Sequence, residues 1–108
     1  MKLEYNKGIL FIRFKGYLDK NVAKKINQVL IPKVLEQKIK YIVLNLYDVL
    51  NVDSFALDAL LNLKCAVKCN KGKICLCEIS KELDKKIKKI NIIKTQNELQ
   101  AFNVIGAI

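Results

Sequence analysis

The most informative segment of this sequence is a short and almost uninterrupted apolar run at residues 41–46, which reads Tyr-Ile-Val-Leu-Asn-Leu. A strand with one solvated face alternates apolar and polar residues, whereas a strand that is covered on both faces is apolar nearly throughout. The run therefore predicts a central strand of a sheet that has other elements packed on both of its sides.

The first part of the chain has the pattern of a β-hairpin. Residues 3–6 form a short extended segment, and residues 9–14 form a second one that is rich in β-branched and aromatic residues. The residues between them, Asn-Lys-Gly at 6–8, are a turn signal. The hairpin is expected at the edge of the sheet, and residues 16–19 are expected to end its second strand.

A helix is predicted to begin near Asn21. Pro32 falls inside its pattern and should kink the helix or separate its last turn, because proline lacks the N–H that a helix interior needs. The apolar face repeats at helical spacing in Val22, Ile26, Val29, Leu30 and Val34.

A loop is predicted at residues 47–52, and a second helix follows it. Asp53 or Ser54 can cap this helix, because their side-chain oxygens accept hydrogen bonds from the free N–H groups of a helix start. The helix is predicted over residues 55–69 and is followed by Gly72, which suits the left-handed position after a helix. Its inward residues are expected to be Ala56, Leu57, Leu60, Leu61, Leu63 and Val67.

The remaining third of the chain again alternates strand and helix patterns. Residues 73–77 predict a strand, Ser80 caps a third helix, and residues 92–94 predict a last short strand. Thr95 or Asn97 then begins a terminal helix. The inward residues are expected to be Leu83, Ile87 and Ile90 in the third helix, and Leu99, Phe102 and Val104 in the terminal one.

The predicted order of elements is ββαβαβαβα, which indicates an α/β fold. Strands that alternate with helices imply a mostly parallel sheet with right-handed crossovers, here with about five strands and about four helices. The N-terminal hairpin makes the sheet mixed, because it adds one antiparallel strand. A length of 108 residues suits a single domain over residues 1–108.

The charge of the chain is strongly positive, with 20 Lys and Arg against 10 Asp and Glu. Such a charge is compatible with binding to nucleic acid or to an anionic membrane. All the basic residues except Arg13 are lysines, however, whereas base and phosphate recognition favours the planar fork of arginine. We interpret the lysines, densest over residues 85–89, as a solvated surface that binds no nucleic acid directly; a functional basic patch on the third helix is the alternative.

The sequence shows no signal for the membrane. No apolar run approaches the roughly 18–20 residues that span a bilayer. Residues 1–7 lack the apolar core of a signal peptide. We therefore expect a cytoplasmic protein with no membrane insertion.

The four cysteines, Cys65, Cys69, Cys75 and Cys77, are expected to be reduced and buried. Their spacing differs from that of zinc knuckles, and the chain has no His to complete a mixed site. A metal or redox role is the alternative.

The usual equipment of an enzyme is missing from the sequence. The absence of His removes the commonest general base and the usual partner of a nucleophilic Ser or Cys. There is also no Gly-rich phosphate loop. A module that binds another protein, without a cofactor, is the better hypothesis, and a small enzyme is the weakest one.

Four segments together resemble a known family. They are Gly-Tyr-Leu-Asp at 16–19, the apolar run at 41–46, Asn-Val-Asp-Ser-Phe-Ala-Leu at 51–57, and Lys-Gly-Lys-Ile-Cys-Leu at 71–76. Their order and separations resemble those of STAS domains, and most closely the small bacterial anti-sigma factor antagonists. The resemblance covers essentially the whole chain.

The resemblance implies a role in partner switching. Such antagonists bind an anti-sigma factor that is also a serine kinase, and a sigma factor is thereby released. Phosphorylation at the start of the second helix breaks the complex. In this sequence Phe55 stands where the family usually has the acceptor hydroxyl, and Ala56 stands where it has glycine. Ser54 is the only hydroxyl residue left in this loop and is therefore the phosphorylation candidate; the alternative is that the phosphoswitch has been lost.

The implied partner surface comprises Tyr17, Asp19, Asp53, Ser54, Phe55 and Ala56, with Tyr47 at its rim. Several of these residues also have structural alternatives. Asp19 and Ser54 can cap helices, Asp53 can brace the loop, and Phe55 can pack into the core. The resemblance leaves the chain a monomer or a weak dimer.

Two further functions are compatible with the sequence. One is a STAS-like accessory subunit of a larger assembly, such as a stressosome scaffold or a lipid-transport complex, which needs no acceptor hydroxyl. The other is a basic protein that binds nucleic acid or an anionic membrane, with binding that falls steeply as salt rises.

Overall fold

The computed structural model describes residues 1–87 and 90–106. Five strands form one mixed sheet, and their order in the sheet is their order along the chain. β1 pairs with β2 antiparallel, and all the later neighbours are parallel. The strands are Lys2–Asn6 (β1), Ile9–Leu18 (β2), Tyr41–Val52 (β3), Lys73–Cys77 (β4) and Ile93–Thr95 (β5). The predicted α/β fold with a mostly parallel sheet is confirmed.

The N-terminal hairpin closes through a two-residue loop. Asn6 pairs with Ile9, and Lys7 and Gly8 between them have φ angles of 51° and 81°. Two left-handed residues in succession give the turn the twist that antiparallel strands require, and glycine adopts that conformation at no steric cost. The hairpin predicted from the turn signal is confirmed.

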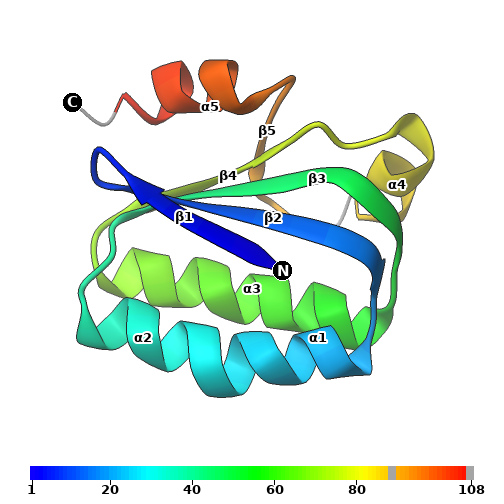
Figure 1. Cartoon of the computed structure of the whole chain (residues 1–108), viewed down its shortest axis with the longest axis horizontal. Coiled ribbons are helices and arrows are strands. Elements are labelled where there is room, and N and C mark those ends of the chain that lie inside the picture. The colour runs from blue at the N-terminus through cyan, green and yellow to red at the C-terminus, as the bar shows by residue number, and fades with distance from the viewer. Residues whose placement is uncertain (88–89, 107–108) are drawn as a thin grey trace.

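The helices divide unequally between the two faces of the sheet (Figure 1). Each new parallel strand is added to the same edge of the sheet, and the connections between parallel strands are right-handed. Together these two rules place the connecting helices on the same face of the sheet. The helical segments after β2 and β3 accordingly lie below the sheet in Figure 1, whereas the C-terminal helix lies above it. The helices are Lys20–Lys25 (α1), Ile26–Leu30 (η1), Ile31–Glu36 (α2), Ser54–Cys69 (α3), Lys81–Lys86 (α4) and Glu98–Ile105 (α5).

Two cores result from this arrangement. The larger core lies between the sheet and the crossover helices, and fully buried residues such as Ile42, Leu44 and Leu60 belong to it. The smaller core lies beneath α5, where Val43 and Cys75 pack with Ala101. The central strand β3 thus contributes to both, as its apolar run predicts.

The prediction of a loop at residues 47–52 is wrong, because β3 continues through Val52. β4 pairs with β3 only as far as Asn45, and beyond that point β2 and β3 continue as a two-stranded arm to the Leu18–Val52 pair. The register shifts twice along this arm, and one of its faces is open to solvent. These shifts interrupt the alternation of apolar and polar residues that would identify a strand with one open face.

The helical segment after β2 continues past Pro32, but its hydrogen-bonding pattern changes on the way. α1 gives way to the π-helical turn η1, in which the N–H of Ile31 bonds to the C=O of Ile26, and α2 follows. Pro32 lies in the first turn of α2, where its missing N–H is tolerated. The sequence predicts that Pro32 kinks the helix or separates its last turn. In the structure a π-helical turn comes just before the proline and separates α2 from α1.

The junction between α3 and β4 differs from the prediction at one residue. Lys71 occupies the left-handed position, with φ 61°, and Gly72 does not. Gly72 is needed for a different reason, since a Cβ built on it would lie 1.8 Å from the carbonyl oxygen of Lys40. The close approach of the chain to the start of β3 therefore requires glycine here.

The C-terminal elements follow the prediction in outline. Ser80 caps α4 and Asn97 caps α5 through their side chains, and Leu83, Ile87 and Ile90 are buried. In α5, however, Ala101 and Ile105 face the core, whereas Leu99 and Val104 are exposed. Lys88 and Lys89 lie outside the described residues. Within those residues, no helix combines the length and the apolar character that crossing a membrane requires.

Candidate functional site

The start of α3 carries an acidic cap and an exposed hydroxyl. The carboxylate of Asp53 accepts a hydrogen bond of 2.9 Å from the N–H of Ala56, so Asp53 is the N-cap and braces the loop. Ser54 is the first helical residue, and its side chain is exposed. The alternative in which Ser54 caps the helix is therefore wrong, and its hydroxyl is not used in that way.

Asp19 caps the neighbouring helix in the same manner. Its carboxylate accepts hydrogen bonds of 3.0 and 3.2 Å from the N–H groups of Asn21 and Val22. The N–H of Asp53 donates to the C=O of Leu18 at 3.0 Å, which holds the end of β2 against the start of α3. Two helix starts, each with a carboxylate cap, therefore lie next to each other.

Phe55 lies beside these caps and is exposed. Its side chain is 57% accessible, so the packed alternative is wrong. It lines a groove of about 380 Å³ between α1 and the start of α3, together with Lys20, Lys24 and Asp58. We name the group of Asp19, Asp53, Ser54, Phe55 and this groove the α3 N-terminal surface.

The other residues of the predicted partner surface lie elsewhere. Ala56 is fully buried, so the prediction that it contacts a partner is wrong: the third residue of the helix faces the sheet. Tyr17 is exposed. Because successive side chains of a strand point to opposite faces of the sheet, and the side chain of Leu18 lies in the large core, the side chain of Tyr17 is on the other face. Tyr47 is 72% exposed and lies further along the arm from the α3 N-terminal surface.

The single arginine of the chain organises a polar network that the sequence did not reveal. Arg13 forms two hydrogen bonds of 2.7 Å to the Glu98 carboxylate and one of 2.8 Å to Glu4. Asn45 donates to both Glu98 and Glu78, at 2.8 and 2.9 Å. The hydrogen bond from Arg13 is the main reason why the pKa of Glu98 is lowered, and burial opposes it. Among the described residues no buried side-chain nitrogen or oxygen lacks a hydrogen-bond partner, and these bonds tie α5 to the sheet.

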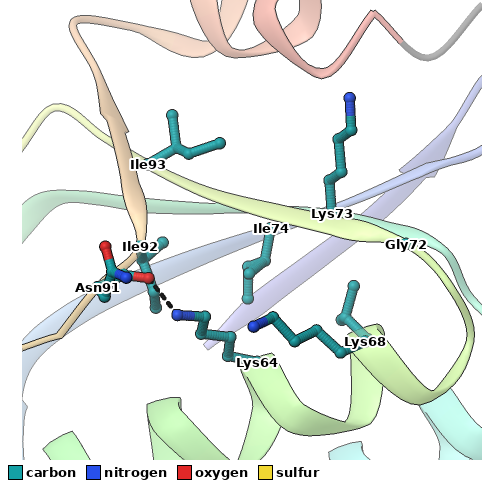
Figure 2. Close-up of a pocket in the computed structure, with 9 residues that line it drawn as sticks. Lys64, Lys68, Gly72, Lys73, Ile74, Asn91, Ile92 and Ile93 are labelled. Atoms are coloured by element: carbon teal, nitrogen blue, oxygen red, sulfur yellow. Dashed lines mark hydrogen bonds between the residues drawn. The ribbon is translucent and has the colours of Figure 1, made fainter.

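A second cavity, of about 260 Å³, lies near the other end of α3 (Figure 2). Figure 2 shows Lys64 and Lys68 approaching it from α3, below the apolar side chains of Ile74 and Ile92. The ammonium group of Lys64 donates to the carbonyl oxygen of Asn91. No acid–base pair lines this cavity among the residues described, and it is separate from the α3 N-terminal surface.

The cysteines divide into two pairs. Cys75 and Cys77 are buried in β4, and burial raises the pKa of their thiols to about 11 and about 12. Cys65 and Cys69 are exposed on α3, so the expectation of burial is wrong for this pair. Among the described residues no group of three or more His, Cys, Asp or Glu side chains could hold a metal ion.

Comparisons with known proteins agree on one fold. The STAS domain model matches residues 1–104. A crystal structure of a proposed anti-sigma factor antagonist from Thermotoga maritima matches with a TM-score of 0.88, at 16% identity over 97% of this chain and 93% of that one. The anti-sigma factor antagonist SpoIIAA in its unphosphorylated form matches at 0.81, with 18% identity over 99% and 98%. A chain of the stressosome, a signal integration and transduction hub, matches at 0.77, with 10% identity over 98% and 96%.

Proposed function

The chain belongs to the STAS domain family, whose model spans all but its last few residues, and we propose that it acts as an anti-sigma factor antagonist. In this role it binds an anti-sigma factor that is also a serine kinase, and a sigma factor is thereby released. The observation that carries the proposal is the exposed pair of Ser54 and Phe55 at the start of a 16-residue helix.

The chemistry of the α3 N-terminal surface suits a protein partner. An exposed aromatic ring beside a groove is a good anchor, since aromatic residues dominate the binding energy of interfaces. Lys20, Lys24 and Asp58 around the groove supply charges of both signs, which orient a partner more than they strengthen its binding. Because Asp19 and Asp53 are held by backbone N–H groups, this surface is preorganised.

Ser54 is the proposed switch. A phosphoryl group would add about −1.5 to −2 charges beside the Asp53 carboxylate. The N–H groups at the start of α3 tolerate that charge within the protein. A partner that packs over Phe55, however, would have to remove the new charge from water, and any carboxylate that it presents there would be repelled. Phosphorylation is therefore expected to dissociate the complex.

Binding measurements on the purified kinase from the same genome test the surface. Phe55→Ala is expected to weaken the complex at least about ten-fold, because an interface anchor is lost. Tyr47→Ala is the matched control, since it removes another exposed aromatic ring, from the arm, and should change the affinity by less than about two-fold. Equal losses in the two variants would contradict the proposed surface.

The switch is tested separately by intact-mass analysis after incubation with the kinase and ATP. The expected result is the gain of one phosphoryl group by the native chain and none by Ser54→Ala. An unmodified native chain that still binds the kinase would leave the binding role in place and exclude the switch.

An accessory subunit of a larger assembly is the second candidate. The observation that favours it is the uncovered face of the β2–β3 arm, where Tyr17, Tyr47 and Leu50 are all exposed. Affinity purification from the native cell, with and without ATP, distinguishes the two. A stable large assembly that is insensitive to ATP supports the subunit, whereas an ATP-sensitive complex with a kinase supports the antagonist.

A further inference from the structure

The outer edge of β1 is an unpartnered strand, and we propose that it pairs with the same edge of a second copy of the chain to form a symmetric dimer. β1 is the first strand of the sheet, and all five of its residues are exposed. An exposed edge strand presents unpaired N–H and C=O groups, which natural proteins protect with short length, charged side chains, proline, a bulge or a covering element. β1 contains no proline, and its pairing with β2 runs without a register shift.

The hairpin geometry fixes which backbone groups point outwards. Hydrogen-bonded and non-hydrogen-bonded pairs alternate along an antiparallel ladder, and the Asn6–Ile9 pair that closes the two-residue loop is of the first kind. The pairs of Tyr5 with Leu10 and of Leu3 with Ile12 are therefore of the second kind. Leu3 and Tyr5 consequently direct their N–H and C=O groups away from β2, towards the free edge.

The charges on β1 select one register. If the two-fold axis passes through Leu3, the Lys2 of each copy lies opposite the Glu4 of the other, and Leu3 faces Leu3. If the axis passes through Glu4, two carboxylates face each other, which is unfavourable. If the axis passes through Tyr5, Lys2 lies opposite the two-residue loop of the other copy and therefore faces no acidic residue. Only the Leu3 register pairs opposite charges and uses the outward-facing backbone groups of Leu3 itself.

The side chains of β1 gain partners in this register. Lys2 lies opposite Arg13 within its own chain, and among the described residues no acidic side chain is within ion-pair distance of it. On the other face Leu3 and Tyr5 are 47% and 62% exposed, and the pairing would cover both. One short strand per copy makes a small interface, so we expect a reversible dimer with a dissociation constant in the high micromolar range.

Sedimentation equilibrium of the untagged protein over a range of concentrations tests this dimer. The mass should rise from 12.4 kDa towards about twice that value. Lys2→Glu and Glu4→Lys should each raise the dissociation constant at least about ten-fold, because two opposite-charge pairs become two like-charge pairs. An equimolar mixture of these two variants should associate again, to within about three-fold of the native constant, since every cross-strand pair is then of opposite charge.

The controls separate the edge from the rest of the surface. Lys25→Glu makes the same charge change on the exposed side of α1 and should leave the native association unchanged. Mixed with Glu4→Lys, it should give no more association than the two variants give when each is measured alone. Circular dichroism checks the fold of each variant. Arg13 keeps its two hydrogen bonds to Glu98 when Glu4 is replaced.

Two results would overturn the proposal. One is a native chain that stays monomeric at millimolar concentration, and the other is a mixture of Lys2→Glu and Glu4→Lys that fails to associate.

Discussion

Two neighbouring residues at the start of α3 have different tasks. The carboxylate of Asp53 satisfies the N–H of Ala56, whereas the adjacent hydroxyl of Ser54 faces solvent. The sequence showed that a cap stands at this position but could not distinguish the two residues, since both types cap well. The choice depends on where the extended segment ends, and the pairing of Leu18 with Val52 sets that point.

This division of tasks predicts different effects on stability. Asp53→Ala should lower the free energy of unfolding by about 1 kcal/mol, because a helix cap is lost. Ser54→Ala should change it by less than about 0.5 kcal/mol, as for an ordinary surface position. Urea denaturation followed by circular dichroism measures both. A cost in Ser54→Ala as large as that in Asp53→Ala would show that Ser54 is the cap.

The thiols also differ at the level of single residues. Cys65 and Cys69 are accessible, whereas Cys75 and Cys77 are buried and have raised pKa values. Since the thiolate is the reactive form, iodoacetamide at neutral pH should modify the first pair in the native protein and the second pair only in denaturant. Peptide mapping by mass spectrometry identifies the modified sites. Rapid modification of Cys75 in native buffer would contradict its burial in β4.

At the scale of elements, the apolar patterns predicted most of the helices and strands, and the unbroken apolar run at residues 41–46 predicted the central strand. The alternation failed to predict the β2–β3 arm, where two register shifts interrupt it. The apolar pattern also failed in α5, where small Ala101 packs on the sheet and large Leu99 is exposed. The orientation of this short terminal helix depends on its short connection to β5 and on the hydrogen bonds of Glu98. The pattern of apolar residues in the sequence reports on neither.

The α3–β4 junction gives a prediction at this scale. Gly72→Ala should lower the free energy of unfolding by more than about 2 kcal/mol, because its Cβ would collide with the backbone at Lys40. Lys71→Gly should leave the protein equally stable or stabilise it by up to about 1 kcal/mol, since glycine adopts a positive φ without strain. Thermal denaturation of both variants measures the effect. A harmless Gly72→Ala variant would contradict the close approach.

At the scale of the whole molecule, the Arg13 network joins elements that are far apart in the sequence. Residues from β1, β2, β3 and α5 meet in it, and Arg13 and Glu98 are separated by 85 positions. No sequence motif marks such a set, because its members share no spacing. The candidate partner surface, in contrast, could be located from local signals, since Asp53, Ser54 and Phe55 are consecutive.

This network predicts a pH dependence of stability. The pKa of Glu98 is lowered in the folded chain from its ordinary value of 4.5. The stabilisation is therefore complete above that value and is lost as the pH falls through the lowered pKa. Glu98→Gln should be less stable by about 1–2 kcal/mol at neutral pH. The difference from the native chain should shrink below about pH 4 and vanish in stronger acid, as urea titrations across this range can show. A constant difference at all pH values would contradict the ion pair.

The agreement between strand order and chain order has a consequence for biosynthesis. Each strand pairs with the one that leaves the ribosome just before it, and none has to insert between two strands that have already joined. Translation at about 5–20 residues per second is slow compared with the formation of local structure. The sheet can therefore be assembled from its N-terminal edge while the rest of the chain is still being made, and the three-residue β5 is added last.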